Sequence, residues 1–224
     1  MSEPAVTTPG PAPAVVELTT PHGPARAHMH AVEGARAALL LGHGANGSVT
    51  APDLRIATEV AIGAGVTVAL FEQPYRVAGR RSPSPAHQLD AAWVAGNEEL
   101  RAGPWRDLPL LAGGRSSGAR VACRTAAATG AIGVLCLAFP LHAPRRSPTA
   151  ELKTRQPELD AVTVPVLVVQ GVRDPFGMPV APPNGTVVQV AGDHGLRADR
   201  AAVAAAVREW LEEQLSRADG RTGR

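Results

Sequence analysis

Short apolar runs alternate along this chain with stretches in which apolar residues recur at the spacing of one helix face. The runs are continuous, which is typical of strands buried on both faces of a parallel sheet. The expected strands are 37–41, 66–71, 108–112, 132–138, 166–170 and 186–190, after an opening hairpin of 15–19 and 25–30. The expected helices are 52 to 63 or 65, 86–100, 117–129 and a final one containing Val203, Val207, Trp210, Leu211 and Leu215.

Strands separated by helices predict an α/β fold, in which a mostly parallel central sheet is covered by helices on both faces. No internal repeat interrupts this order. In sheets of this kind ligands bind beyond the carboxyl ends of the strands. The residues that directly follow the strands are therefore the ones to search for chemistry.

The chain of 224 residues has the length of one compact α/β domain. Residues 1–13, rich in Pro, Thr and Ala, are expected to form a disordered lead-in, and 218–224 a frayed tail. A single domain then covers 14–217. The connection 139–165 is only about 25 residues long, which is too short for a large cap domain, so we expect an open site.

Composition and charge argue against several classes of function. The formal net charge is +2 with acids and bases interspersed, whereas a nucleic-acid surface needs a one-sided basic stripe. No apolar run reaches the roughly 18 residues of a membrane span, and the N-terminus lacks the features of a signal peptide. Cys123 and Cys136 have no metal-ligand spacing and are expected to be small buried residues. We expect a cytoplasmic protein with no nucleic-acid, membrane or metal partner.

One motif lies between an expected strand and an expected helix: Gly114-Arg115-Ser116-Ser117-Gly118, of the form G-x-S-x-G. The flanking glycines remove side chains that would collide where strand meets helix, and the serine is then exposed on a strained backbone. The helix start favours developing negative charge. Ser116 is therefore the candidate nucleophile, and the alternative is an ordinary glycine-rich turn.

Two further strand ends carry an acid and a base. Asp174 follows the strand 166–170, where a carboxylate can orient a histidine and stabilise its imidazolium. His194 follows the strand 186–190, and a histidine can accept and return a proton near neutral pH. Asp193 is a second candidate partner, but neighbouring side chains in a loop usually diverge, so Asp174 is preferred. The alternatives are an Asp-Pro turn and an ordinary loop histidine.

A glycine-rich loop, residues 42–47, follows the strand 37–41. Its small residues let the backbone approach a substrate closely, and the N–H of Ala45 is a candidate donor to an oxyanion. The N–H of Ser117, directly after the candidate nucleophile, is the second donor. The alternatives are a flexible connection and a phosphate-binding loop, but the phosphate-loop pattern with its lysine is absent.

The order along the chain joins these motifs. Loop, nucleophile, acid and base follow one another in the chain order of the α/β hydrolases. From about residue 13 to 216 the sequence resembles this family, and within it the small dienelactone-hydrolase-like proteins. More narrowly, it is similar to the branch named for a subunit of the non-specific lethal chromatin complex and a testis-expressed relative.

Three stretches carry the narrower resemblance. Residues 43–47 are similar to the family's His-Gly-Ala-Gly-Gly, with Asn46 where a glycine is usual. Residues 71–83 resemble its Phe-Pro-Tyr and Arg-Arg-x-Pro segment, and 114–118 resemble its Gly-Lys/Arg-Ser-x-Gly elbow.

The resemblance implies an α/β-hydrolase fold without a large cap domain, with Ser116 as nucleophile, His194 as base and Asp174 as its orienter. Dienelactone hydrolases proper use a cysteine nucleophile, so that particular activity is not expected here. The side chains expected near the substrate are His43, Asn46, Tyr75, Arg80, Arg81 and Leu141. The two arginines, together with Arg76, are candidates to hold an anionic group of the substrate, and the alternative is a solvated charged loop.

These residues predict a serine hydrolase that acts on an ester or thioester through an acyl-enzyme, without a cofactor, as a monomer or homodimer. The first alternative is a catalytically silent scaffold or interaction protein, because fold does not imply function. The second is a binding domain for a small acid. The required residue types at all three triad positions favour the enzyme.

Overall fold

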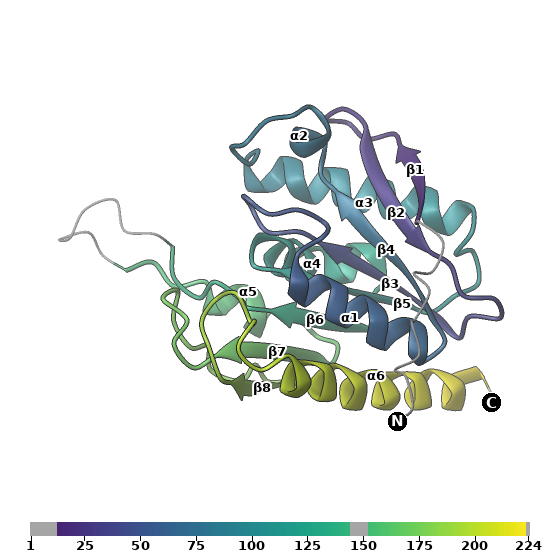
Figure 1. Ribbon diagram of the computed structural model, residues 1–224. Helices are drawn as coiled ribbons and strands as arrows, with labels where there is room; N and C mark the ends of the chain where they lie inside the picture. Colours follow the sequence, from purple (N-terminus) through teal and green to yellow (C-terminus); the bar gives the residue numbers. More distant parts are fainter. Residues whose placement is uncertain (1–12, 144–151, 223–224) are drawn as a thin grey trace, which may run out of the picture.

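The computed structural model describes residues 13–143 and 152–222. In this part of the chain eight strands form one sheet, in the order β1-β2-β4-β3-β5-β6-β7-β8 (Figure 1). β2 is antiparallel to β1 and to β4, and every other neighbouring pair is parallel. The strands are β1 (Ala14–Leu18), β2 (Ala25–His30), β3 (Ala37–Gly42), β4 (Val66–Glu72), β5 (Leu110–Arg115), β6 (Gly133–Leu137), β7 (Val166–Gly171) and β8 (Gly185–Val190).

Helices cover both faces of the sheet, as the sequence predicts (Figure 1). The helices are α1 (Pro52–Gly63), α2 (Pro74–Val77), α3 (Ala86–Ala102), α4 (Ser117–Thr129), α5 (Gln156–Asp160) and α6 (Arg200–Thr222). Successive residues of a strand point to opposite faces. Leu39 and Leu41 accordingly pack with apolar residues of α1 and α6, whereas Leu40 packs with those of α3 and α4. The predicted mostly parallel α/β sheet is therefore confirmed.

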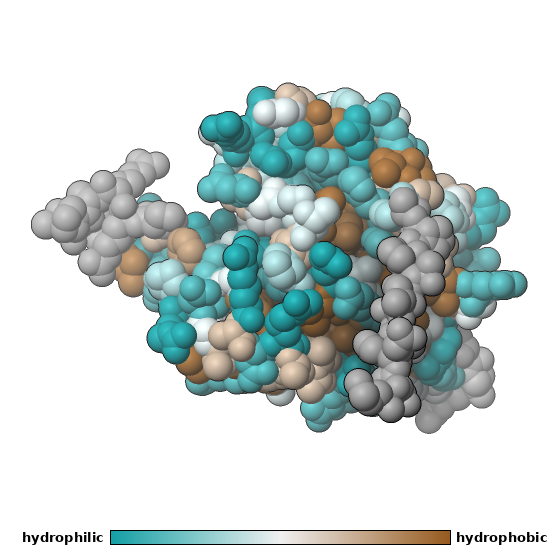
Figure 2. Space-filling view, viewed as in Figure 1, coloured by the Kyte–Doolittle hydropathy of each residue, from teal (hydrophilic) through white to brown (hydrophobic). Residues whose placement is uncertain are grey.

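The face of the molecule that carries α1 and α6 is mostly polar (Figure 1 and Figure 2). Teal and pale residues dominate the face seen in Figure 2, and brown residues lie between them in separate areas. On α6 the apolar positions predicted from the sequence, among them Val207, Trp210 and Leu215, are buried against the sheet. The predicted burial of Cys123 and Cys136 is also confirmed: both are free thiols, with 3.4 Å between their sulfur atoms.

Strand β5 differs from its predicted bounds, because it begins at Leu110 and continues to Arg115. The extension pairs Gly113 and Gly114 with β3 on one side and β6 on the other. A Cβ on Gly114 would lie 2.5 Å from the carbonyl oxygen of Gly42, so only glycine lets the strands approach this closely up to the turn.

Two short helices lie in segments expected to be loops. α2 begins at Pro74, which suits the first turn of a helix, and α5 lies within the connection 139–165. Residues 144–151 of that connection lie outside the described residues, as do 1–12 of the expected lead-in.

The expected frayed tail, 218–224, is corrected over its first part. α6 continues to Thr222, and only the last two residues lie outside the described chain. The Ala218 side chain is buried, and the Asp219 carboxylate pairs with Arg36 at 2.5 Å. These contacts hold the last turns against the body of the domain, which the polar composition of the tail does not reveal.

Candidate active site

Ser116 stands on the turn between β5 and α4. Its backbone has φ 52° and ψ −111°, in the region where a side chain is strained, and its N–H donates to the Leu137 carbonyl at 2.9 Å. The turn closes tightly, since a Cβ on Gly118 would lie 2.2 Å from the carbonyl oxygen of Gly42. The glycines of the motif therefore let α4 start directly against β3, and they leave the serine beyond the sheet edge.

His194 links this serine to a carboxylate. Its Nε2 lies 3.0 Å from Ser116 Oγ, and its Nδ1 lies 2.7 Å from Asp174 Oδ2. A carboxylate only accepts hydrogen bonds, so Nδ1 carries the proton and Nε2 is left to accept from the serine hydroxyl. The His194 ring also packs against Phe176, with 4.6 Å between ring centroids.

The Asp174 side chain is completely buried and has partners for both oxygens. The Phe176 N–H donates to Oδ1 at 2.8 Å, and Gln170 Nε2 donates to Oδ2 at 2.9 Å, beside His194. Gln170 is fully buried at the end of β7. Sequence reasoning missed this residue, and its one signal was a polar side chain closing an otherwise apolar run.

Two buried side chains, His43 and Tyr75, form hydrogen bonds that hold the glycine-rich loop after β3 in place. His43 Nδ1 donates to the Gly44 carbonyl at 2.8 Å, and its Nε2 accepts from the Gln73 N–H at 3.1 Å. Burial lowers the pKa of His43, which keeps the ring neutral for this bridging role. The Tyr75 hydroxyl donates to the Ala45 carbonyl at 2.7 Å, and burial raises the pKa of Tyr75 to about 12.

Comparison with known proteins now identifies the family. Residues 35–207, more than half of the chain, match the family described as the alpha/beta hydrolase domain. The chain belongs to the α/β-hydrolase family. The resemblance predicted from the motifs is thus confirmed at this level, and the narrower branch stays a prediction.

Solved structures share the fold of this α/β hydrolase at low sequence identity. Est1E from Butyrivibrio proteoclasticus is 14% identical over 90% of this chain and 99% of its own, with a TM-score of 0.72. XC6422 from Xanthomonas campestris, described as a serine hydrolase without lid, is 20% identical over 93% of this chain and 98% of its own, with a TM-score of 0.66. A dienelactone hydrolase from Anabaena variabilis is 18% identical over 90% and 97%, with a TM-score of 0.68. No curated protein matches the chain.

Besides the contact between Asp174 and His194, an ion pair between Arg115 and Asp53 stabilises the site of this α/β hydrolase. Arg115 Nε lies 2.8 Å from Asp53 Oδ2 in the first turn of α1, and Arg115 Nη2 donates to the His194 carbonyl at 3.1 Å. Burial raises the pKa of Asp53, while the Arg115 guanidinium opposes that rise. This contact joins α1, the serine turn and the histidine loop, and no sequence motif pointed to it.

A cavity of about 540 Å³ opens over these groups. Five predicted site residues line it: Ala45, Asn46, Ser116, Ser117 and His194. Its remaining lining comes mainly from α4, from residues 83–89 and from the segments around Pro140, Arg155 and Phe176.

The other predicted substrate-contacting residues lie elsewhere. His43 and Tyr75 are buried beneath the loop, and Leu141 is buried beside Pro140, which lines the cavity in its place. Arg80 and Arg81 are exposed and do not line the cavity. The reason is local: the chain folds into α2 after β4, and then turns at Gly79, where φ is 73°.

Within the described residues, no group of three or more His, Cys, Asp or Glu side chains is arranged to hold a metal ion. No helix in the described part of the chain has the length and apolar character needed to cross a membrane.

Proposed function

We propose that this protein is a serine hydrolase that cleaves an ester or thioester through an acyl-enzyme. The observation that carries the proposal is the chain of hydrogen bonds from Asp174 through His194 to Ser116, at 2.7 and 3.0 Å. It ends on a serine whose strained backbone and position before α4 are those of a nucleophile. Membership of the α/β-hydrolase family supports the same chemistry.

In the first half of the reaction, Ser116 Oγ attacks the acyl carbonyl carbon while its proton passes to His194 Nε2. The carbonyl π bond breaks, and the charge moves to the oxygen. Asp174 stabilises the imidazolium, because its buried carboxylate already faces Nδ1. Collapse of the tetrahedral intermediate breaks the bond to the leaving alcohol or thiol, which takes the proton from Nε2.

In the second half, His194 Nε2 takes a proton from water, and the hydroxide that forms attacks the acyl-serine. The bond to Ser116 Oγ then breaks and the serine recovers its proton from the imidazolium. The products are a carboxylic acid and free enzyme, and the residues supply every proton transfer. No cofactor is needed.

The oxyanion is held in this proposal by the N–H groups of Ala45 and Ser117. Both residues line the cavity beside Ser116, and Ser117 is the first residue of α4, where N–H groups lack helical acceptors. Among the described residues the Ala45 N–H has no acceptor either. A single donor of this kind typically contributes about 3–4 kcal/mol to the transition state.

Labelling with a fluorophosphonate probe tests the proposal. Wild-type protein is expected to give one adduct, on Ser116, and Ser116→Ala and His194→Ala are expected to lose it. Ser82→Ala is the matched control, because Ser82 is exposed and lies outside the cavity, so this variant should label like wild type.

The same experiment decides against the alternative. A folded wild-type protein that takes no label and hydrolyses no ester would overturn the proposal in favour of a catalytically silent scaffold. Label that persists in Ser116→Ala would show that a different nucleophile reacts.

A further inference from the structure

Four arginines line the cavity. Arg115 is paired with Asp53, and the other three, Arg120, Arg124 and Arg155, form a group that we term the arginine wall. Arg120 and Arg124 lie on α4, and Arg155 directly precedes α5. Residues 116, 120 and 124 share one helix face, because four residues make about one turn. Arg120 is therefore about 6 Å along the helix axis from the candidate nucleophile, and Arg124 about 12 Å.

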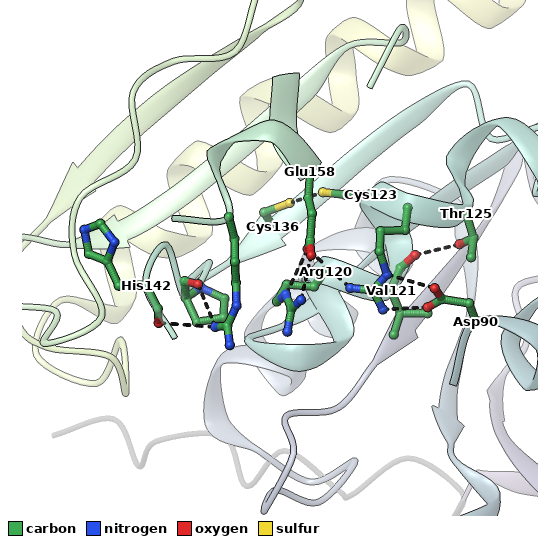
Figure 3. Close-up of polar contacts among 11 residues, drawn as sticks. Asp90, Arg120, Val121, Cys123, Thr125, Cys136, His142 and Glu158 are labelled. Atoms are coloured by element: carbon green, nitrogen blue, oxygen red, sulfur yellow. Dashed lines mark hydrogen bonds and ion pairs between the residues drawn. The ribbon is translucent and has the colours of Figure 1, made fainter. Parts of the chain in front are cut away.

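Two of the three guanidinium groups are neutralised by carboxylates. Arg120 binds Glu158 through Nε at 2.8 Å and Nη2 at 2.6 Å, and Figure 3 shows the two side chains facing each other. Arg124 binds Asp90 through two bonds of 2.8 and 2.6 Å, and also contacts Glu158 at 3.2 Å. The carboxylates of Asp90 and Glu158 thus both form their ion pairs with arginines of α4.

Arg155 has no carboxylate partner among the residues that the structure describes. Its Nη1 donates to the carbonyls of Pro140 at 3.0 Å and His142 at 3.2 Å, while Nε and Nη2 have no acceptor there. Burial and the repulsion of Arg120 lower the pKa of Arg155, although Glu158 opposes them. An arginine still remains charged at neutral pH.

Among the described residues, the arginine wall therefore carries one uncompensated positive charge, from three arginines against two carboxylates. Its free Nε and Nη2 groups form the edge of a guanidinium that matches the two oxygens of a carboxylate. An arginine with a purely structural role would be expected to have protein acceptors for its other N–H groups too, whereas Nε and Nη2 of Arg155 have none among the described residues. A solvated surface charge would not line the same cavity as the candidate nucleophile.

Resting on the proposed function, we propose that Arg155 binds a carboxylate of the substrate, so that the preferred substrates are esters with a free carboxylate several bonds from the scissile carbonyl. Arg120 lines the same cavity, but Glu158 neutralises its charge, so Arg155 is the group assigned to the anion. The neighbouring cavity residues Leu89, Pro140 and Phe176 supply apolar contacts for the carbon chain between the two ends.

The test compares matched charged and neutral esters. Monomethyl adipate carries the carboxylate on the acyl part, and methyl adipamate replaces it with a neutral carboxamide of the same shape. 4-Butyryloxybutanoate and its carboxamide place the same groups on the alcohol part. We expect wild type to prefer the carboxylate of at least one pair by about 10- to 100-fold in kcat/KM.

Arg155→Gln should abolish that preference, mainly by raising KM for the carboxylate ester. The reason is that a remote anion is bound equally in the ground state and the transition state. Arg155→Lys keeps the charge without the planar edge and should retain part of the preference. Arg81→Gln is the matched control, because it removes one exposed arginine outside the cavity and should leave the preference at its wild-type value.

The outcomes separate this inference from the proposed function. Turnover of all four esters with no charge preference would overturn the carboxylate site and leave the serine hydrolase standing. A preference that survives in Arg155→Gln would also overturn it. Loss of fluorophosphonate labelling in Arg155→Gln would show that the arginine only maintains the fold. Absence of turnover and of labelling in wild type would refute the proposed function itself.

Discussion

The two sides of the cavity are built by different means. On the side of Ser116, the chemical groups stand at the ends of parallel strands, and backbone hydrogen bonds of the sheet fix their positions. On the side of the arginine wall, Arg120, Arg124 and Arg155 are held by ion pairs and carbonyl contacts of their own side chains. The first arrangement gives the precision that a reaction demands. The second arrangement gives a charged surface, and single substitutions can change its charge without disturbing the hydrogen bonds of the sheet.

On the side of Ser116, the largest loss of activity should come from Asp174→Asn. The Phe176 N–H and Gln170 Nε2 both donate to this carboxylate, so an asparagine has to satisfy these donors with a single oxygen. Its NH₂ group then favours the wrong histidine tautomer, and we expect kcat for a neutral ester to fall by about 10⁴-fold.

Asp193→Asn is the control for that measurement. Asp193 is adjacent to the histidine, yet its Oδ1 accepts from the Gly195 N–H at 2.9 Å, a bond that asparagine can keep. Steady-state kinetics on both variants, with thermal unfolding as a check on folding, should show a loss confined to Asp174→Asn. An equal loss in both would contradict the assignment of Asp174 as the partner.

The next largest effect should come from Gly118→Ala, which tests how tightly the backbone fixes the first side. The new Cβ would lie 2.2 Å from the carbonyl oxygen of Gly42, and its three nearest atoms all belong to the Gly42 backbone, so no flexible side chain can move aside. We expect a loss of about 3 kcal/mol in the free energy of unfolding, together with impaired activity.

Urea unfolding measures this loss, and Gly63→Ala provides the reference. Gly63 ends α1, and a Cβ on this residue would meet no atom within 4 Å, so that exchange should change stability by less than about 1 kcal/mol. Similar small changes in both variants would mean that the turn is more adaptable than its contacts indicate.

The contrast between the two sides also explains why some features of the site could be predicted from the sequence and others could not. The serine turn, Asp174 and His194 each follow a strand, so local patterns and chain order were enough to find them. Gln170, the contact between Asp53 and Arg115, and the arginine wall depend on side chains that meet only after folding. The sequence pointed to Arg80 and Arg81 for an anion site, but the turn at Gly79 leaves these residues exposed.

A smaller effect should come from Glu158→Gln, which alters the second side. The substitution keeps the shape of the side chain and removes one of the two carboxylates that neutralise the wall. We expect unfolding to become easier by about 1 kcal/mol, since the pair is only partly buried. At the same time, kcat/KM for the carboxylate ester should rise a few-fold relative to its carboxamide, because the wall gains net positive charge.

Glu213→Gln is the matched control, because it removes an exposed carboxylate 3.9 Å from Arg217 on α6. It should change stability by less than about 0.5 kcal/mol and leave ester selectivity unaltered. If Glu158→Gln also left stability and ester selectivity unchanged, the Glu158 carboxylate would not control the charge of the arginine wall.

The smallest effect should be the dependence of stability on pH that His43 creates beneath the glycine-rich loop. Burial lowers its pKa in the folded protein, so the unfolded chain takes up a proton first as the pH falls through the ordinary value of 6.5. The stability that the neutral ring contributes is therefore present above pH 6.5 and declines below it, by at most about 1.4 kcal/mol per pH unit. His30 acts in the same direction, whereas Asp53, whose pKa is raised by burial, opposes the decline at lower pH. Urea unfolding of wild type and His43→Gln between pH 8 and pH 5 should give a shallower decline in the variant, and parallel curves would mean that the buried ring does not set this dependence.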